Sequence, residues 1–589
     1  MNPSTACAQV VVDELVRQGV VEVVVAPGSR NAPLSLALAA ADAAGRLRLH
    51  VRLDERDAGF LALGLAKVSR SPVAVACTSG SAVANLLPAV VEASYSGVPL
   101  LLLTADRPPE LRATGANQAI DQSDVFGRYV RLTLDAGPPD ERAGAVAAWR
   151  STVSRAVAFA DDPATPGPVQ LNLPFRDPLV PDGDLTWCEP LDGRTDADGD
   201  PLPWTTDRRR RPAVPESITD VLGAVGRLGL PSRGLVVVGD GVDEDGVDAA
   251  LALAESCGWP LLSEPSGNAR RGPQAMAHAS LALADGATAA ALGAPDVVVA
   301  VGRVGLSRPV TALLRSAGVV VVVAAPGIDR WSDPVRRADV VVASVPTPAG
   351  DPDADTDITA DVDVTADADA TADADSGWLD RWRAADAAAG ARLDELLGAQ
   401  EGLTGLEVAR TLWDVAAAES LLLVAASRPV RDLEATARVR DDAPWVIGNR
   451  GTSGIDGLVS TAWGAALAHG RRTGGPSYAL LGDVAALHDV GGFVVGAREP
   501  VPDLVVVVCD NDGGGIFSSL EQGAPEHAAH FDRVFGTPHG RDLVAVVAAL
   551  GLPAVRVTTR VELVVELDRA TAAGGVHVVV ATTGPRPAE

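Results

Sequence analysis

Leu480-Leu481-Gly482-Asp483-Val484 and, further on, Leu504–Val508 followed by Cys509-Asp510-Asn511-Asp512-Gly513 are the stretches that decide the fold. Each reads as a strand that ends in an oxygen-bearing side chain, Asp483 in the first and Asn511 in the second. Parallel strands joined by a helix bring their carboxyl ends to one edge of a sheet, where ligands usually bind. A carboxylate and an amide oxygen beside a glycine-rich turn suit a hard cation such as Mg²⁺ that bridges to phosphates. The structural alternative is that both residues only cap helices.

The rest of the chain alternates apolar strand-like runs with helical segments. Expected strands include Glu22–Ala26, Val73–Cys77, Leu100–Thr104, Val297–Val301 and Val319–Ala324. This alternation predicts an α/β fold of mostly parallel sheets flanked by helices. We divide the chain into three domains, residues 1–190, 212–346 and 378–589, the last opening with a helix at Trp378–Leu397. A polar linker is expected before residue 212.

Residues 347–377 separate the second domain from the third and contain ten aspartates and no basic residue. A calcium loop of the EF-hand type fails here, because Thr356 and Val362 stand where that loop needs glycine and glutamate. A disordered, self-repelling linker is the interpretation that the composition favours.

Charge and composition exclude several classes of function. The net charge of −28 argues against a nucleic-acid partner, since phosphate contacts need a basic face. Lys67 is the only lysine, so a P-loop lysine is absent and anionic ligands must be held by arginine. Five scattered cysteines show neither metal spacing nor a disulfide framework. We expect a cytoplasmic protein without membrane insertion, because no apolar run reaches about 18 residues and no signal peptide is evident.

Further polar and glycine-rich runs lie along the chain: Ala26-Pro27-Gly28-Ser29-Arg30-Asn31, Asp54-Glu55-Arg56, Thr104-Ala105-Asp106-Arg107-Pro108-Pro109-Glu110, Gly115-Ala116-Asn117-Gln118-Ala119-Ile120 and Gly448-Asn449-Arg450-Gly451. With the two opening stretches, they resemble the thiamine-diphosphate-dependent enzymes, and among these the 2-succinyl-5-enolpyruvyl-6-hydroxy-3-cyclohexene-1-carboxylate synthases. Val484 and Asp510 depart from that family's metal motif, but both ligand positions are kept.

The resemblance implies pyrimidine-binding, central and diphosphate-binding domains, with thiamine diphosphate and Mg²⁺ or Mn²⁺ as cofactors. It implies that Glu55 is catalytic, through a bond to the pyrimidine ring nitrogen. The implied metal ligands are Asp483, Asn511 and the carbonyl of Gly513. The implied cofactor-binding residues are Glu55, Ile455, Gly482, Asp483, Val484, Asn511, Ile516 and Phe517.

The implied activity is that of a transferase of menaquinone biosynthesis. Such an enzyme decarboxylates 2-oxoglutarate and adds the succinyl unit to isochorismate, with release of CO₂. Both substrates are dianions, so several arginines are expected around them. The implied substrate-binding residues are Ser29, Arg30, Arg107, Asn117, Gln118, Arg308, Ser427, Arg431 and Arg450. In this superfamily the two halves of a site come from different chains, so we expect a homodimer or a dimer of dimers with active sites at the subunit interface.

Two alternatives remain open from the sequence. One is another thiamine enzyme, such as an acetohydroxyacid-synthase-like carboligase or an oxoacid decarboxylase acting on pyruvate. The other is a non-catalytic nucleotide-binding or regulatory α/β protein. Gly239-Asp240-Gly241 in the central domain suggests a nucleotide site, but the pattern G-x-G-x-x-G is not met there and a structural turn is the favoured interpretation.

Overall fold

The computed structural model describes residues 1–184, 186–208, 214–325, 327, 329, 331–348 and 377–584. Within these residues the strands form three sheets of six strands each, and every pairing between neighbouring strands is parallel. The α/β fold predicted from the sequence is therefore confirmed. Nearly all of the predicted acidic linker, residues 349–376, lies outside the described residues.

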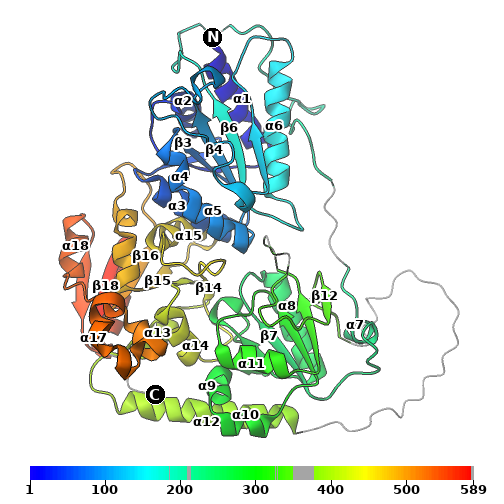
Figure 1. The fold of residues 1–589 in the computed structure, drawn as a ribbon, viewed down its shortest axis with the longest axis vertical. Coiled ribbons are helices and arrows are strands. Elements are labelled where there is room, and N and C mark those ends of the chain that lie inside the picture. The colour runs from blue at the N-terminus through cyan, green and yellow to red at the C-terminus, as the bar shows by residue number, and fades with distance from the viewer. Residues whose placement is uncertain are drawn as a thin grey trace, which may run out of the picture.

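The N-terminal sheet has the strand order β2-β1-β3-β4-β6-β5 and stands at the top of Figure 1. Its central strands are buried at every residue, which explains their continuous apolar sequence. The strands are β1 (Glu22–Val25), β2 (Arg48–Val51), β3 (Val73–Cys77), β4 (Leu100–Asp106), β5 (Leu132–Asp135) and β6 (Val169–Pro174). The helices are α1 (Pro3–Arg17), α2 (Ala32–Ala43), α3 (Glu55–Ser69), α4 (Ser81–Asn85), α5 (Leu87–Ser96) and α6 (Ala145–Ala160).

The central sheet has the order β12-β11-β10-β7-β8-β9. The chain adds β8 and β9 on one side of β7 and β10 to β12 on the other, so the strand order switches between β7 and β10 as in doubly wound folds. Valine dominates its strands, in keeping with burial on both faces. The strands are β7 (Gly234–Val238), β8 (Leu261–Ser263), β9 (Ala275–Met276), β10 (Val297–Val301), β11 (Val319–Val323) and β12 (Val340–Val342). The helices are α7 (Ile218–Gly223), α8 (Glu244–Cys257), α9 (Ala279–Ala284), α10 (Gly286–Leu292) and α11 (Arg308–Ser316).

The C-terminal sheet repeats the order of the N-terminal one, as β14-β13-β15-β16-β18-β17. Its strands are β13 (Leu421–Val424), β14 (Trp445–Ile447), β15 (Ser477–Gly482), β16 (Leu504–Asp510), β17 (Ala554–Val557) and β18 (Val576–Thr582). Its helices are α13 (Gly405–Val415), α14 (Arg428–Thr436), α15 (Leu458–Thr473), α16 (Asp483–His488), α17 (Ala528–Phe531), α18 (Leu543–Ala549) and α19 (Arg560–Ala573). No described helix has both the length and the apolar character needed to cross a membrane.

The helix α12 (Trp378–Gly398) runs along the bottom of Figure 1, beneath the central sheet. Its place in the sequence predicts that it belongs to the C-terminal domain. Its residues Trp378 and Trp382 are buried in the apolar cluster of the central sheet, and the Trp378 indole donates to the carbonyl of Gly234 at 2.8 Å. The first part of α12 thus packs on the central sheet, because its aromatic face is covered there, whereas Asp394 in its second part forms an ion pair with Arg410 of α13.

The N-terminal and C-terminal sheets share one core through the helices α3 and α15. A single apolar cluster includes residues from both helices. Gly64 and Gly464 mark the crossing: a Cβ atom added to Gly64 would lie 2.1 Å from the Thr461 carbonyl oxygen, and one added to Gly464 would lie 2.1 Å from that of Leu61. Both positions therefore require glycine, and the two units are packed backbone against backbone.

Candidate functional site

The ends of β15 and β16 lie side by side, with Gly482 opposite Cys509 in the register. Asp483 starts α16 directly after β15 and is 2% exposed. Its Oδ1 accepts a hydrogen bond from the backbone N–H of Val484 at 2.7 Å, and its Oδ2 accepts from that of Gly513 at 2.8 Å. Burial raises the pKa of Asp483, although these two hydrogen bonds act in the opposite sense. The predicted neighbourhood of Asp483 and the turn after β16 is present.

Asn511 completes a group of oxygens at this edge. One atom of its side-chain amide lies 2.8 Å from the carbonyl oxygen of Gly513 and 3.3 Å from Asp483 Oδ2. An amide nitrogen in this position donates to both oxygens. With the amide turned over, three oxygens converge instead, an arrangement that a divalent cation stabilises. The residues present therefore fit a hard cation.

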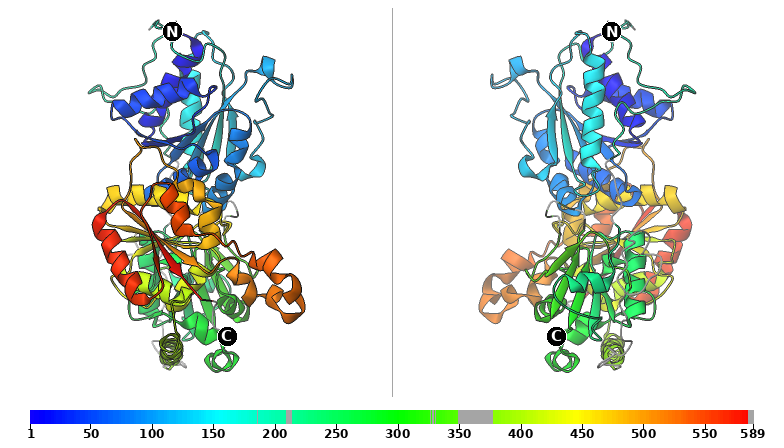
Figure 2. Two further views of the ribbon diagram at one scale, coloured as in Figure 1. Left: turned by 90° about the vertical axis from the view of Figure 1, so that its left-hand side faces the viewer. Right: turned by 90° about the vertical axis from the view of Figure 1, so that its right-hand side faces the viewer.

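The turn that carries these atoms needs glycine at Gly513. This residue has φ +142°, and a Cβ there would lie 2.1 Å from the carbonyl oxygen of Gly536. The approach of Gly536 belongs to an excursion of the chain, residues 514–540, that leaves the sheet after β16 and returns before α18. In the side views of Figure 2 its helical segments project from the body of the molecule.

Ile516 and Phe517, predicted to bind the cofactor, lie at the start of this 514–540 excursion, in a 3₁₀ turn at Gly515–Ser519. The Phe517 ring lies 5.8 Å from that of Phe535, which in turn lies 6.2 Å from Phe531. The excursion therefore has a small cluster of half-buried aromatic rings, and it holds both predicted residues close to the Asp483 turn.

Two neighbours of the turn, Arg556 and His539, were not singled out in the sequence. Asp510, which departs from the family motif, forms an ion pair with Arg556 of β17 at 3.3 Å. His539, near the end of the excursion, places Nε2 3.4 Å from Asp483 Oδ2. Asp483, Asp510 and His539 have donor atoms within 4.8 Å of one another. Neither Arg556 nor His539 belongs to a recognisable motif, because both reach the site only through tertiary folding.

Glu55 is the first residue of α3, and Asp54 caps this helix by accepting from the N–H of Arg56 at 2.8 Å. The Glu55 side chain is half-buried and accepts a hydrogen bond from the amide of Asn85 at 3.3 Å. Arg56 donates to the carbonyl of His488, the last residue of α16, at 3.1 Å. The start of α3 thus lies against the end of α16, whereas Asp483 lies at its beginning.

The predicted polar residues of the N-terminal unit gather at the carboxyl edge of its sheet. Arg107, after β4, donates to Ser79 Oγ at 2.5 Å, and Ser79 Oγ donates to the carbonyl of Gln118 at 3.0 Å. Arg30, after β1, donates to the carbonyl of Phe175 at 2.9 Å. Burial and then the charge of Arg30 lower the pKa of Arg107, so the two guanidinium groups face the same region. Ser29, Asn117 and Gln118 are exposed there. The role of Ser79 at this edge was not predicted.

A second arginine group lies between the central and C-terminal units. Burial lowers the pKa of Arg431, and the charges of Arg450 and Arg308 contribute to the shift. Arg308 begins α11, is 79% exposed, and lies 3.8 Å from Glu521 of the 514–540 excursion. Like charges held together in this way favour an anion. Ser427 precedes α14, and Arg431 donates to its backbone carbonyl at 2.7 Å.

The loop that carries Arg450 and Ile455 is anchored to the N-terminal unit. Glu92 of α5 accepts from the backbone N–H groups of Gly451 at 2.9 Å and Thr452 at 2.7 Å. Lys67 of α3, the only lysine, donates to the carbonyl of Gly448 at 2.7 Å. Among the described residues, no hydrogen bond or ion pair joins the Arg30–Arg107 group to the Arg431–Arg450 group.

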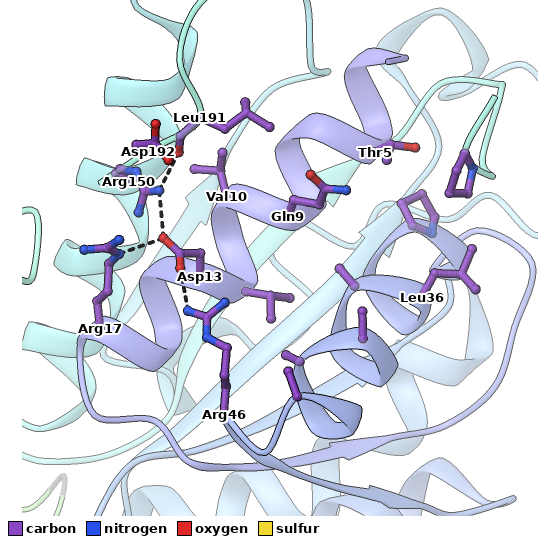
Figure 3. Close-up of a pocket in the computed structure, with 17 residues that line it drawn as sticks. Thr5, Gln9, Val10, Asp13, Arg17, Leu36, Arg46, Arg150, Leu191 and Asp192 are labelled. Carbon is purple, nitrogen blue, oxygen red and sulfur yellow. Dashed lines mark hydrogen bonds and ion pairs between the residues drawn. The ribbon is translucent and has the colours of Figure 1, made fainter. Parts of the chain in front are cut away.

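A hollow of about 470 Å³ beside α1 and α2, shown in Figure 3, contains none of the predicted site residues. Asp13 lies in it and is bonded to Arg17, Arg46 and Arg150. Burial opposes ionisation of Asp13, but these three arginines lower its pKa below the ordinary range. The Asp13 carboxylate is therefore paired by arginines that line the same hollow.

Comparison with known proteins places both end units. Two family models match, the thiamine pyrophosphate enzyme N-terminal TPP binding domain over residues 5–125 and the C-terminal TPP binding domain over residues 437–581. A protein of Saccharopolyspora erythraea is 47% identical over 97% of this chain and 94% of its own length. Relatives from Thermobifida fusca and a Nocardioides species are 48% and 44% identical, over 99% and 98% of this chain and 96% and 95% of their own lengths. All three carry the name 2-succinyl-5-enolpyruvyl-6-hydroxy-3-cyclohexene-1-carboxylate synthase.

Proposed function

Because this chain belongs to the 2-succinyl-5-enolpyruvyl-6-hydroxy-3-cyclohexene-1-carboxylate synthases, a family of thiamine pyrophosphate enzymes, we propose that it decarboxylates 2-oxoglutarate and adds the succinyl unit to isochorismate in menaquinone biosynthesis. When bound, thiamine diphosphate supplies the carbon nucleophile and the electron sink for both steps. The observation that carries the proposal is the meeting of Asp483, Asn511 and the Gly513 carbonyl at the ends of β15 and β16.

Those three oxygens are assigned to Mg²⁺ or Mn²⁺, which would hold the diphosphate. The Asn511 amide lies 2.8 Å from the Gly513 carbonyl and 3.3 Å from Asp483 Oδ2, and a turn of this amide would bring its oxygen beside those two, which supports the assignment. Gly482 and Val484 flank the metal-binding carboxylate in the chain. We assign Ile455, Ile516 and Phe517 to apolar contact with the cofactor; all three side chains are half-buried.

Glu55 is assigned the proton transfer with the pyrimidine ring. Its half-buried carboxylate accepts from Asn85 through Oε2 and has no other hydrogen-bond donor among the described residues, so Oε1 is available to a ligand. A bond from such a carboxylate to a ring nitrogen favours the tautomer in which the exocyclic nitrogen acts as a base. Glu55→Gln keeps the shape but not the charge. We expect this substitution to lower turnover by about 10²–10⁴-fold, the usual contribution of a positioned acid or base.

The two arginine groups are assigned to the carboxylates of the two substrates. Arg30 and Arg107, with Ser29, Asn117 and Gln118, would bind from the N-terminal unit. Arg308, Arg431 and Arg450, with Ser427, would bind from the other side. Two clusters of like charge are what two dianions require, because arginine offers paired donors to a carboxylate.

We place each complete site between two chains. Within one chain, Arg56 beside Glu55 reaches His488 at the end of α16, a helix about 9 Å long that begins at Asp483. Pairing of Glu55 with Asp483 of a second copy follows the pattern of the superfamily, whose sites are shared between chains. Mixing Glu55→Gln and Asp483→Asn proteins tests this pairing. Shared sites predict that co-refolded mixtures regain activity, because one site of each mixed dimer keeps both residues. Sites contained in one chain predict no recovery.

The activity itself is tested by supplying 2-oxoglutarate, isochorismate, thiamine diphosphate and Mg²⁺ and following isochorismate by its absorbance. Loss of isochorismate that depends on 2-oxoglutarate and releases an equal amount of CO₂ is expected. A folded, cofactor-loaded protein that consumes pyruvate instead would disprove the substrate assignment while leaving the cofactor assignment intact.

A further inference from the structure

His539 lies at the far end of the 514–540 excursion, yet it returns to the turn after β16. Its side chain is 13% exposed, and Nε2 lies 3.4 Å from Asp483 Oδ2 and 3.9 Å from Asp510 Oδ1. On the other side of the ring, Nδ1 lies 3.4 Å from Asp512 Oδ1. Three carboxylates thus face one imidazole, and one of them is the proposed metal-binding carboxylate.

The backbone fixes which ring nitrogen carries the proton in the neutral imidazole. The N–H of Arg541 donates to Nδ1 at 3.0 Å, so Nδ1 presents a lone pair. The proton is then on Nε2, which is the nitrogen that faces Asp483. An Nε2 that carries a proton has no lone pair for a cation, so His539 is a donor to the carboxylate and is not itself a metal ligand.

Asp483 Oδ2 is held by three donors from two parts of the chain. It accepts from the N–H groups of Asn511 at 3.1 Å and Gly513 at 2.8 Å, both in the turn, and from His539 in the returning segment. The first two donors are close to Asp483 in the sheet, whereas His539 depends on closure of the whole excursion.

Backbone hydrogen bonds beside the Asp483 turn hold the excursion closed. Gly514 N–H donates to the carbonyl of Gly536 at 2.6 Å, and Gly540 N–H donates to Asp512 Oδ1 at 2.7 Å. The excursion therefore begins and ends within hydrogen-bonding distance of the Asp483 turn. Its first residues include Ile516 and Phe517, so the segment that would contact the cofactor is tied to the carboxylate that would hold the metal.

We propose that His539 is a positioning residue that orients the Asp483 carboxylate for metal binding, and that it couples metal affinity to closure of the 514–540 excursion. The inference rests on the proposed function for the metal itself. Donors that orient metal-binding groups in this way typically change metal affinity by 10–100-fold when they are removed. Metal binding should in turn favour the closed excursion, because the two equilibria are linked.

The test compares two substitutions that keep different halves of the imidazole. His539→Gln keeps a donor at the position of Nε2, and His539→Asn keeps an acceptor at the position of Nδ1. Mn²⁺ is titrated into each protein in the presence of thiamine diphosphate, and free Mn²⁺ is followed by its six-line electron paramagnetic resonance signal. His530→Asn, an exposed histidine on α17 in the same excursion, is the matched control.

We expect His539→Asn to weaken Mn²⁺ binding about tenfold or more, and His539→Gln to stay within about threefold of the parent, as does the control. Amide hydrogen exchange over residues 514–536 should slow on adding Mn²⁺ in the parent but much less in His539→Asn.

Equal affinity in all variants would overturn the inference. So would loss in His539→Gln with retention in His539→Asn, since closure through Arg541 would then be the only role. Nitrogen directly bound to Mn²⁺, seen by electron spin echo modulation, would also refute it. A parent protein that binds no Mn²⁺ would instead contradict the proposed metal site.

Discussion

Replacing Lys67 with methionine should loosen the loop that carries Arg450. The Lys67 side chain is 9% exposed, and its ammonium group donates to the Gly448 carbonyl at 2.7 Å. It also lies 3.4 Å from Glu92 Oε1 and from Ser96 Oγ. Methionine fills nearly the same space but offers no donor, so the carbonyl and the carboxylate both lose a partner.

The free-energy cost of Lys67→Met depends on the partners that the Gly448 carbonyl and Glu92 keep. An unpaired buried carbonyl costs about 1–3 kcal/mol, and breaking a buried ion pair costs about 3–5 kcal/mol when the remaining charge is left alone. Glu92 is not left alone, because Ser96, Gly451 and Thr452 still donate to it. We therefore expect a total near 3 kcal/mol, which is about a hundredfold in a local opening equilibrium.

The assay is amide hydrogen exchange, because a chain with three sheets does not unfold in two states. The amides of Gly451 and Thr452 should exchange up to about a hundredfold faster in Lys67→Met, while those of β10 keep the parent rate. Lys67→Arg, which keeps a charged donor, should recover much of the protection. Michaelis constants should rise more than turnover falls. Unchanged exchange at Gly451 and Thr452 in a folded variant would refute the reasoning.

Three further predictions concern other parts of the molecule. Gly464→Ala should lower the melting temperature, because its Cβ would meet the Leu61 carbonyl at 2.1 Å at a cost of about 1–3 kcal/mol, whereas Gly470→Ala, with nothing within 4 Å, should raise it slightly. Equal melting temperatures would contradict the close packing. Burial and the charge of Asp489 raise the pKa of Asp57 to about 8, so the folded chain keeps a proton that the unfolded chain releases near pH 4. The melting temperature of the parent should therefore fall between about pH 5 and 8, and that of Asp57→Asn should fall less. Parallel profiles of melting temperature against pH would show that Asp57 does not titrate there. Arg450→Ala should raise the Michaelis constant of a substrate about 10–100-fold and leave the affinity for thiamine diphosphate, measured by calorimetry, unchanged. A variant that binds both the substrate and thiamine diphosphate more weakly would place Arg450 in the cofactor site instead.

The sheets could be predicted from the sequence because their strands are continuous runs of β-branched and aliphatic residues. The predicted strands Val73–Cys77 and Val297–Val301 have the bounds found in the structure. The residue at which a strand ends depends instead on how far the neighbouring strand pairs with it. β16 continues two residues past the predicted Val508, because Cys509 and Asp510 pair with Ala581 and Thr582 of β18.

Tertiary packing accounts for what the sequence did not indicate. The helix at Trp378 looked like the start of the C-terminal domain, but its tryptophans are covered by the central sheet. At the candidate site, the strand-end rule identified Asp483 and Asn511, which lie at adjacent strand ends. It could not identify His539, because that side chain arrives by a long excursion without a strand of its own.

The crossing of α3 and α15 has a consequence for how the chain is made. About 390 residues separate the two helices, and a ribosome adds roughly 5–20 residues per second, so the inner face of α3 waits about 20–80 s for its partner. During that time the apolar surface of α3, flat because of Gly64, faces solvent or a chaperone. Nascent chains that stop before residue 458 should therefore aggregate even though the first sheet is complete. The N-terminal unit has a finished sheet but an unfinished core.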